Sequence, residues 1–269
     1  MRLESGEVVR ADIVIANPDL PYVYEQLLPA GGDASYKAEA TRLIDDLDYS
    51  AAVIAFNWAL TAPLPRLLHH NVFLSSDYEG SWTRPARVAD FDAPRQHNFY
   101  VHNPCATDAS AAPPGGASIM VLLPVANLQE QAKRASARGE AVPSVEEMVA
   151  AGRAAVLRRF AADGHGDLAP LIAHETVITP PEWRERYNIA HGAVFGLSHG
   201  LTQLACFRPP TRTGLSFWPE TPVPSGLYFV GASTRPGNGV PLVMMGAAVT
   251  FDNIVRDAAA GRVAAPRAA

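Results

Sequence analysis

The strongest constraint on the fold is a strand, a glycine-rich loop and a helix that follow one another near the end of the chain. Residues 227–230, LYFV, are apolar and β-prone, as expected of a buried strand. Gly231 follows at once, and residues 233–239, STRPGNG, predict a loop. A helix is predicted over about residues 240–255, because Pro241 suits a first turn, where its missing N–H is no loss. The start of such a helix attracts an electron-rich group, because its N–H groups and its dipole point outward.

Three interpretations of this element were weighed. A phosphate cradle of the nucleotide-binding kind needs a second strand with an acidic ribose ligand about 20 residues on. Only 30 residues follow Gly239, and the helix and an Ala-rich tail take them up. Alternatively, the helix start lies under the pyrimidine edge of a flavin, where backbone N–H groups stabilise the charge of the reduced form. The third interpretation is a turn that only joins a core strand to a core helix, and spacing alone leaves the last two open.

The amino terminus predicts a hairpin that starts abruptly. Residues 3–8, LESGEV, place Ser5 and Gly6 in a turn. The second arm, residues 8–15, is long and ends in the buried-strand pattern IVI, whereas the first arm is very short. A chain that starts inside a hairpin is expected to be truncated.

The middle of the chain mixes strands and helices without an internal repeat, which predicts an α+β region. A capping box is expected where Ser144 precedes Glu147, after Pro143. Strands are expected at residues 51–60, 72–74, 98–102, 119–125 and 174–178, and helices at 34–47, 63–70, on both sides of Pro143 within 127–162, and from Pro180.

Composition excludes several classes of protein. The 269 residues are 48% hydrophobic with a net charge of −5, which fits a folded globular protein and argues against nucleic acid as the main partner. Cys105 and Cys206 are the two cysteines, too few for a disulfide framework or a zinc site. The uncharged stretch 109–129 contains Pro113 and Pro114, so it is not expected to span a membrane. No signal peptide is expected either, because charged residues follow Met1.

Several segments together resemble one family. Residues 227–248, LYFVGASTRPGNGVPLVMMGAA, resemble the carboxy-terminal flavin-binding signature of bacterial and fungal phytoene desaturases, in the flavin-containing amine oxidase-like superfamily. Residues 8–20, VVRADIVIANPDL, are similar to the strand that closes the nucleotide domain in that family. Residues 99–128 look like the fungal-type branch, and residues 187–208 match the segment that leads to the last flavin element. Matched segments in the right order are more specific than any one of them.

The resemblance implies an α/β (mixed α+β) fold in two parts. Residues 1–20 and 222–269 would be a partial FAD-binding, Rossmann-like domain of the glutathione reductase-like kind. Residues 21–221 would be a substrate and membrane-contacting domain of antiparallel sheet and helices. The cofactor would be FAD, no catalytic residue is assigned, and no metal is expected. The residues expected to contact the flavin are Gly231, Ala232, Thr234, Gly237, Gly239, Val240, Pro241 and Gly246.

The implied activity is FAD-dependent introduction of double bonds into a carotene, in carotenoid biosynthesis. A long apolar polyene has no polar handle, so the site needs an apolar tunnel and correct placement more than acids and bases. A cytoplasmic location, peripheral on a membrane, is implied because the substrate dissolves in lipid. The candidates for the tunnel wall, each of which also fits ordinary core packing, are Leu122, Leu123, Phe195, Leu197, Met244 and Met245.

The chain also departs from the family pattern. No G-x-G-x-x-G follows an early strand, so the adenine and ribose end of FAD has no expected binding region here. The chain is therefore expected to be truncated, with a separate chain as a candidate source of the nucleotide-binding half. The alternatives are a non-enzymatic remnant or subunit, or a related flavin oxidoreductase such as an isomerase, a saturase or an amine oxidase. The loop 234–239 has no aromatic residue, which counts against an amine oxidase.

The histidines, the segment GLSHG and a group of basic residues allow other functional interpretations. Six histidines form no compact ligand pair with acidic neighbours at metal-site spacing, so no metal site is expected at them; they are His69, His70, His165, His174, His191 and His199. Residues 196–200, GLSHG, match the letters of a hydrolase elbow, but no histidine follows His199 to complete the triad. Basic residues within 153–159 fit either lipid headgroup contact or a solvated helix face.

Overall fold

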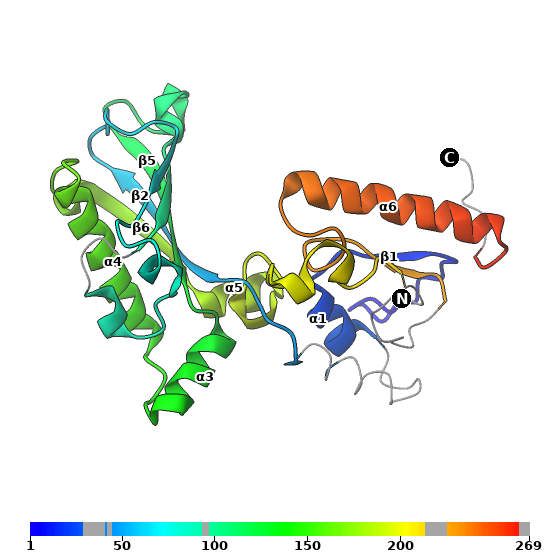
Figure 1. Cartoon of the computed structure of the whole chain (residues 1–269). Coiled ribbons are helices and arrows are strands. Elements are labelled where there is room, and N and C mark those ends of the chain that lie inside the picture. The colour runs from blue at the N-terminus through cyan, green and yellow to red at the C-terminus, as the bar shows by residue number, and fades with distance from the viewer. Residues whose placement is uncertain (29–40, 42–44, 93–96, 213–224, 264–269) are drawn as a thin grey trace. The chain divides into compact units, whose positions relative to one another are not determined.

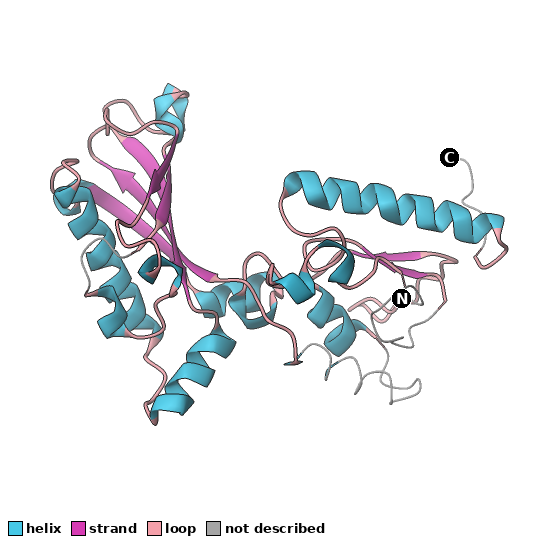
Figure 2. Ribbon diagram, in the orientation of Figure 1, coloured by secondary structure: helices cyan, strands magenta, loops and turns pink. Residues whose placement is uncertain are grey.

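The computed structural model describes residues 1–28, 41, 45–92, 97–212 and 225–263, and these form two compact units. Unit 1 contains Met1–Ser50, Asn188–Ala190 and Phe195–Ala269, and unit 2 contains Ala51–Tyr187 and His191–Val194. Figure 2 shows that both units contain strands as well as helices. The helix expected at residues 34–47 falls largely outside the described residues.

Unit 2 is built on a five-stranded sheet in the order β3-β4-β5-β2-β6, in which every neighbouring pair is antiparallel. The antiparallel sheet expected from the resemblance is thus confirmed. In β5, buried and half-buried residues alternate strictly, because successive side chains of a strand point to opposite faces. The strands are β2 (Ala52–Leu60), β3 (His70–Phe73), β4 (Phe99–His102), β5 (Ala117–Val125) and β6 (Ile172–Ile178).

Helix α4 (Val145–Ala162) lies along one face of this sheet and closes the core of unit 2 (Figure 1). The approach is close at Gly152, where an added Cβ would come within 2.9 Å of the Leu123 side chain. Ser144 and Glu147 form the expected capping box at the start of α4, so that prediction is confirmed. A polar contact adds to the packing, since the Trp58 indole and the Arg153 guanidinium both donate to the Glu175 carboxylate.

Two further helices complete unit 2. Helix α3 (Leu128–Arg138) begins at a capping box formed by Asn127 and Glu130, and ends at Gly139, whose φ of 67° is the left-handed geometry of a helix terminus. Helix α5 (Pro180–Tyr187) starts at the predicted proline pair, and its Trp183 indole donates to the Val53 carbonyl. The 3-10 turns of this unit lie at Gly80–Trp82, Val88–Phe91, Pro104–Ala106, Ala109–Ala111 and Ala169–Leu171.

Unit 1 is built on two short parallel strands, β1 (Val14–Ala16) and β7 (Leu227–Phe229), with the long helix α6 (Val240–Ala259) beside them (Figure 1). The short helix α1 (Leu20–Tyr22) follows β1, and its N-cap is Asp19, whose carboxylate accepts from the Leu20 N–H. A π-helical turn, Val23–Leu27, continues α1, and 3-10 turns lie at Leu201–Gln203 and Ala205–Phe207. A further 3-10 turn, Ala190–Gly192, has Ala190 in unit 1 and Gly192 in unit 2.

The structure corrects two element predictions. Residues 63–70 form no α-helix; two prolines restrict the backbone there, and His70 instead opens β3 by pairing with His102. The prediction of a long second arm over residues 8–15 is wrong as well, because the strand there, Val14–Ala16, includes only the last two of these residues. The tight turn itself is confirmed, with Arg2 bridging Val8 and Gly6 at a φ of 84°.

The packing units do not follow the boundaries expected from the resemblance. Residues 21–28 and 195–212, expected in the substrate domain, pack in unit 1 with β1 and β7. Packing and functional division are different properties, so the assignment of a flavin domain and a substrate domain stays a prediction. Among the described helices, none combines the length and apolar character needed to cross a membrane.

Candidate functional site

Strand β7 is the buried base of the candidate site in unit 1. Its three residues are all buried, because β1 pairs with it in parallel on one side and the Thr211 carbonyl accepts from the Phe229 N–H at 2.8 Å on the other. The chain leaves the strand through Val230, whose N–H still donates to the Ala16 carbonyl. Gly231 then turns the chain with a φ of 114°, a conformation that favours glycine.

The loop after β7 is folded back on itself and on the start of α1. The Thr234 hydroxyl and N–H both donate to the Gly231 carbonyl, and Thr234 is buried. The Ser233 hydroxyl donates to the Asp19 carboxylate at 2.6 Å. Gly196 lies against this contact, since an added Cβ there would be 2.5 Å from the Ser233 oxygen. The loop is therefore held in one conformation by its own polar contacts.

The buried side chain of Arg208 supports the loop through hydrogen bonds. Arg208 has no exposed surface, and its guanidinium donates to four backbone carbonyls, those of Leu197, Ser198, Gln203 and Ala232. Burial lowers the pKa of Arg208, yet a guanidinium keeps its charge at any physiological pH. Arg235 donates to the Arg208 carbonyl and so links the loop to the same arginine.

Helix α6 packs closely over the loop because of Gly246. An added Cβ at Gly246 would lie 2.8 Å from the Arg235 carbonyl oxygen, so only glycine allows this approach. Thr250, one turn further on, donates through its hydroxyl to the Phe229 carbonyl at 3.2 Å. Strand β7, the loop after it and helix α6 thus pack against one another as one element.

The start of α6 is open. Gly239 occupies the N-cap position with a φ of 86°, and no side chain caps the first turn. An added Cβ at Gly239 would meet no atom within 4 Å. The Val243 N–H is already bonded to the Gly239 carbonyl, so the N–H groups of Val240 and Leu242 precede the helical ladder and carry the positive end of the helix dipole. This end of the helix can bind an electron-rich group.

The eight residues expected at the flavin therefore separate into two sets. Gly239, Val240 and Pro241 are exposed at the open helix start, and Gly237 lies just before them. Gly231, Ala232, Thr234 and Gly246 shape the loop and its support. The structure brings all eight together in one element, and their contact with a flavin stays a prediction.

His199 is an additional residue at this loop. Its ring nitrogen would be 3.7 Å from a Cβ added at Gly237, and a hydrogen bond joins it to the Asn238 side chain. Burial and the Arg208 charge lower its pKa, which keeps the imidazole neutral near pH 7. The neighbouring Ser198 hydroxyl accepts from the Gly200 N–H, as in an ordinary turn. The sequence signal for His199 is its place in the GLSHG segment.

The six candidates for a tunnel wall do not share one environment. Leu123 has no exposed surface and belongs to the core of unit 2, and Leu197 is buried in unit 1. Met244 and Met245 are exposed on α6. Since these residues belong to two separate packing units, a common wall stays a prediction.

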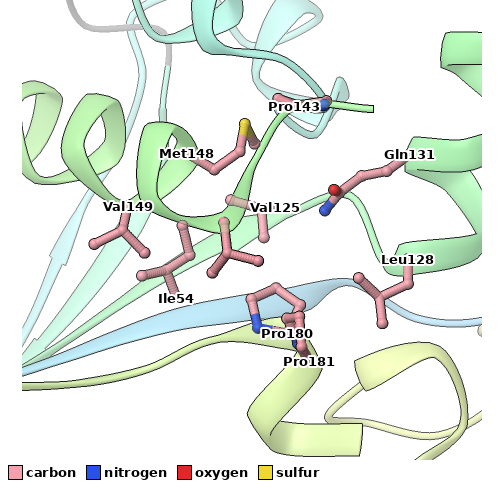
Figure 3. Close-up of a pocket in the computed structure, with 10 residues that line it drawn as sticks. Ile54, Val125, Leu128, Gln131, Pro143, Met148, Val149, Pro180 and Pro181 are labelled. Atoms are coloured by element: carbon pink, nitrogen blue, oxygen red, sulfur yellow. The ribbon is translucent and has the colours of Figure 1, made fainter. Parts of the chain in front are cut away.

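Unit 2 contains an apolar pocket between helices α3 and α4 and the neighbouring strands. Figure 3 shows Ile54, Val125, Met148 and Val149 turned toward one another in it. Its only amide, Gln131, donates to the Ala126 carbonyl. The cavity volume of about 20 Å³ suits one water molecule and excludes a polyene, so the pocket is a packing feature.

A larger hollow of about 360 Å³ lies elsewhere in unit 2, and sequence reasoning missed it. Its volume is in the range of small-molecule sites. Burial lowers the pKa of His97, which lines it, and the Nε2 atom of this histidine is buried without a hydrogen-bond partner among the described residues. The other lining residues are Ala51, Ser81, Trp82, Thr83, Arg84, Pro85, Asn98 and Pro124.

The fold is similar to part of a known structure. An oxidoreductase from Methanosarcina mazei matches 92% of this chain with a TM-score of 0.50 and 18% sequence identity, and the match covers 44% of that structure. At this identity the likeness concerns the fold alone. The chain therefore has a mixed α/β fold, similar to part of a larger known structure. No family model matches the sequence.

Sequence comparison is more specific. A phytoene desaturase from Neurospora crassa is 35% identical over 260 residues, which are 96% of this chain and 40% of that protein. A zeta-carotene-forming phytoene desaturase from Myxococcus xanthus is 35% identical over 256 residues, 95% of this chain and 44% of that protein. The chain thus spans less than half the length of these relatives. It matches the carboxy-terminal part of a phytoene desaturase-like protein, so the predicted resemblance is confirmed.

Proposed function

We propose that this chain supplies part of the flavin site and the substrate region of an FAD-dependent carotene desaturase. The observation that carries the proposal is the open start of α6, held in place by β7 and its glycine-rich loop. The residues fit the group, because a flavin gathers negative charge at one edge when reduced and oriented N–H groups stabilise such charge. A bound flavin would supply the hydride acceptor.

The contribution of this chain is then positioning and charge stabilisation. Val240 and Leu242 would present backbone N–H groups to the flavin, and the missing Cβ of Gly239 leaves room for a flat ring. The neutral His199 imidazole at the same loop would add a polar group without a second positive charge. A substrate with no polar handle depends on correct placement more than on acids and bases.

The same proposal requires a partner for the adenine and ribose end of FAD. Helix α6 exposes apolar side chains around much of its circumference, and large exposed apolar patches mark interaction sites in soluble proteins. We infer that the nucleotide-binding half, in the same polypeptide or in a separate chain, covers this apolar surface. The exposed apolar residues of α6 are Val240, Leu242, Met244, Met245, Val249, Phe251 and Val255.

Flavin retention tests the proposal. The chain is purified alone and co-expressed with a front half that carries G-x-G-x-x-G, and the flavin absorbance is recorded for both. Flavin in the co-expressed sample only is the expected result, and it would justify an assay with phytoene. Stoichiometric flavin on the chain alone would contradict the need for a second half. Absence from both samples would favour a non-enzymatic remnant, while flavin with no desaturation would favour a related flavin oxidoreductase.

A matched pair of glycine variants locates the site. Gly239→Asp places a carboxylate at the helix start and should weaken flavin binding at least about tenfold. The carboxylate would repel the electron-rich edge of a flavin bound there. Gly139→Asp is the control, since Gly139 has a φ of 67° and equally open surroundings but lies at the end of α3. Equal flavin retention in both variants would indicate that the flavin does not bind at the start of α6.

We also propose that the protein associates peripherally with a membrane from the cytoplasmic side. Tyr78 and Trp82 form an edge-to-face pair in unit 2 with 72% and 69% of their surfaces exposed. Exposed aromatic side chains with a polar tip are typical of membrane interfaces. Co-sedimentation with phosphatidylcholine vesicles should fall when both are changed to Ser, and should stay unchanged for Tyr187→Ser, the control on α5.

A further inference from the structure

Three histidines meet at the outer edge of the unit 2 sheet. β3 is the last strand at this edge among the described residues, and β4 is its neighbour. His70 on β3 is paired directly with His102 on β4, and His69 immediately precedes β3. His102 lies far from His69 and His70 in the sequence, and only strand pairing brings it to them.

The ring nitrogens are close enough to share one ion. One ring nitrogen from each histidine lies within 4.8 Å of the other two. The Nε2 atoms of His69 and His102 are 2.9 Å apart. Two neutral imidazole nitrogens at this distance need a proton or a cation between them, because facing lone pairs repel.

The outer nitrogens of two rings are already held by hydroxyl groups. His69 Nδ1 is 2.6 Å from the Thr107 hydroxyl, and His70 Nδ1 is 2.6 Å from the Tyr100 hydroxyl. When Nδ1 donates to these oxygens, the lone pair stays on Nε2, which is the ligand form of histidine. Metal-binding histidines are oriented in this way by hydrogen bonds to their second nitrogen. The backbone of His69 is fixed as well, since its carbonyl accepts from the Asn103 N–H at 2.8 Å.

We propose that His69, His70 and His102 bind one Zn²⁺ ion. Imidazole nitrogens suit zinc, and three protein ligands with an open fourth position are a common zinc arrangement. The fourth position would face solvent on the side of the exposed His70. A bound ion would join β3 and β4 to the turn that carries Thr107, and so secure a sheet edge that has no further strand beside it among the described residues.

Zinc titration of the tag-free chain tests the proposal. Isothermal titration should show one saturable Zn²⁺ site per chain. His102→Ala should weaken binding at least about 100-fold, more than the loss of a hydrogen-bonded supporting group. His174→Ala is the control, because His174 is an exposed histidine on β6 of the same sheet. The zinc affinity of this variant should equal that of the unchanged chain.

Two further measurements separate a metal site from a simple histidine contact. Thr107→Val should weaken zinc binding about tenfold, because it removes only the group that orients His69. Hydrogen exchange of β3 and β4 should slow on addition of zinc, and exchange without zinc shows whether each variant is folded. No saturable binding by the unchanged chain, or equal binding by folded His102→Ala, would overturn the proposal and leave a hydrogen bond between His69 and His102.

Discussion

The two units differ in how completely they bury their apolar side chains. In unit 2, the sheet and α4 enclose a core in which Phe56, Val101, Val121 and Phe160 have no exposed surface. In unit 1, α6 buries four residues of its length and leaves apolar side chains such as Phe251 exposed. Unit 2 therefore encloses its own apolar core, whereas unit 1 leaves apolar side chains of α6 at the surface.

The largest effect is expected from removing the same side chain in each unit. Phe160→Ala should destabilise unit 2 by about 3–5 kcal/mol, because Phe160 packs against Phe73 and Phe99 with no exposed surface. Phe251→Ala should change stability by no more than about 0.5 kcal/mol, because 63% of Phe251 is exposed. Urea unfolding followed by peptide-resolved hydrogen exchange measures both. Equal effects would show that α6 is buried in solution and would break the comparison.

In unit 1, the Asp257 carboxylate near the end of α6 accepts several hydrogen bonds. Burial alone would raise the pKa of Asp257, but hydrogen bonds from Arg212, Tyr228 and Arg262 outweigh it and lower the pKa. The Tyr228 pKa is raised to about 12, first by burial and then by the bond to Asp257.

Asp257→Asn should therefore destabilise unit 1 by about 2–3 kcal/mol, since it weakens charge-assisted hydrogen bonds. A lowered carboxyl pKa contributes stability above the unfolded pKa, and this contribution is lost as pH falls from about 4 through the folded value. Exchange of α6 measured from pH 7 down to pH 3 should show this acid sensitivity in the unchanged chain and not in Asp257→Asn. Asp252→Asn, an exposed change on the same helix, should alter neither.

A smaller effect is expected at the two helix starts. Ser144→Ala removes the cap of α4 and should cost about 1 kcal/mol, because the Glu147 N–H loses its side-chain acceptor. α6 has no side-chain cap to lose. Ser136→Ala within α3 is a control that removes no cap. A cost near zero for Ser144→Ala, by urea unfolding, would mean that the box is replaced by solvent.

Patterns with short range were predicted well from sequence. The capping box at Ser144, the proline that opens α6 and the apolar run of β5 each depend on neighbouring residues, and each was confirmed. The glycine loop was recognised for the same reason. The helix expected at residues 63–70 was wrong because pairing of His70 with His102 overrode local propensity.

Features that depend on distant segments could not be predicted. The support of the loop by Arg208 needs carbonyls from residues 197, 198, 203 and 232, and no local pattern marks that arginine as buried. The histidine cluster likewise requires the register between β3 and β4. Sequence reasoning thus located the candidate flavin element, and only tertiary structure shows what holds it.

The smallest effect on stability is expected for exposed methionines of α6 in unit 1, in contrast to a buried methionine of unit 2. Met244→Gln combined with Met245→Gln should change the free energy of unfolding by less than about 0.5 kcal/mol, because both side chains are more than half exposed. Their loss should nevertheless reduce capture of the co-expressed front half, since they belong to the exposed apolar surface that we propose this half covers. Met148→Gln is the contrasting control, because Met148 is buried in unit 2 and should destabilise the fold instead. Unchanged capture of the co-expressed front half by the α6 variant would mean that these methionines lie on ordinary surface.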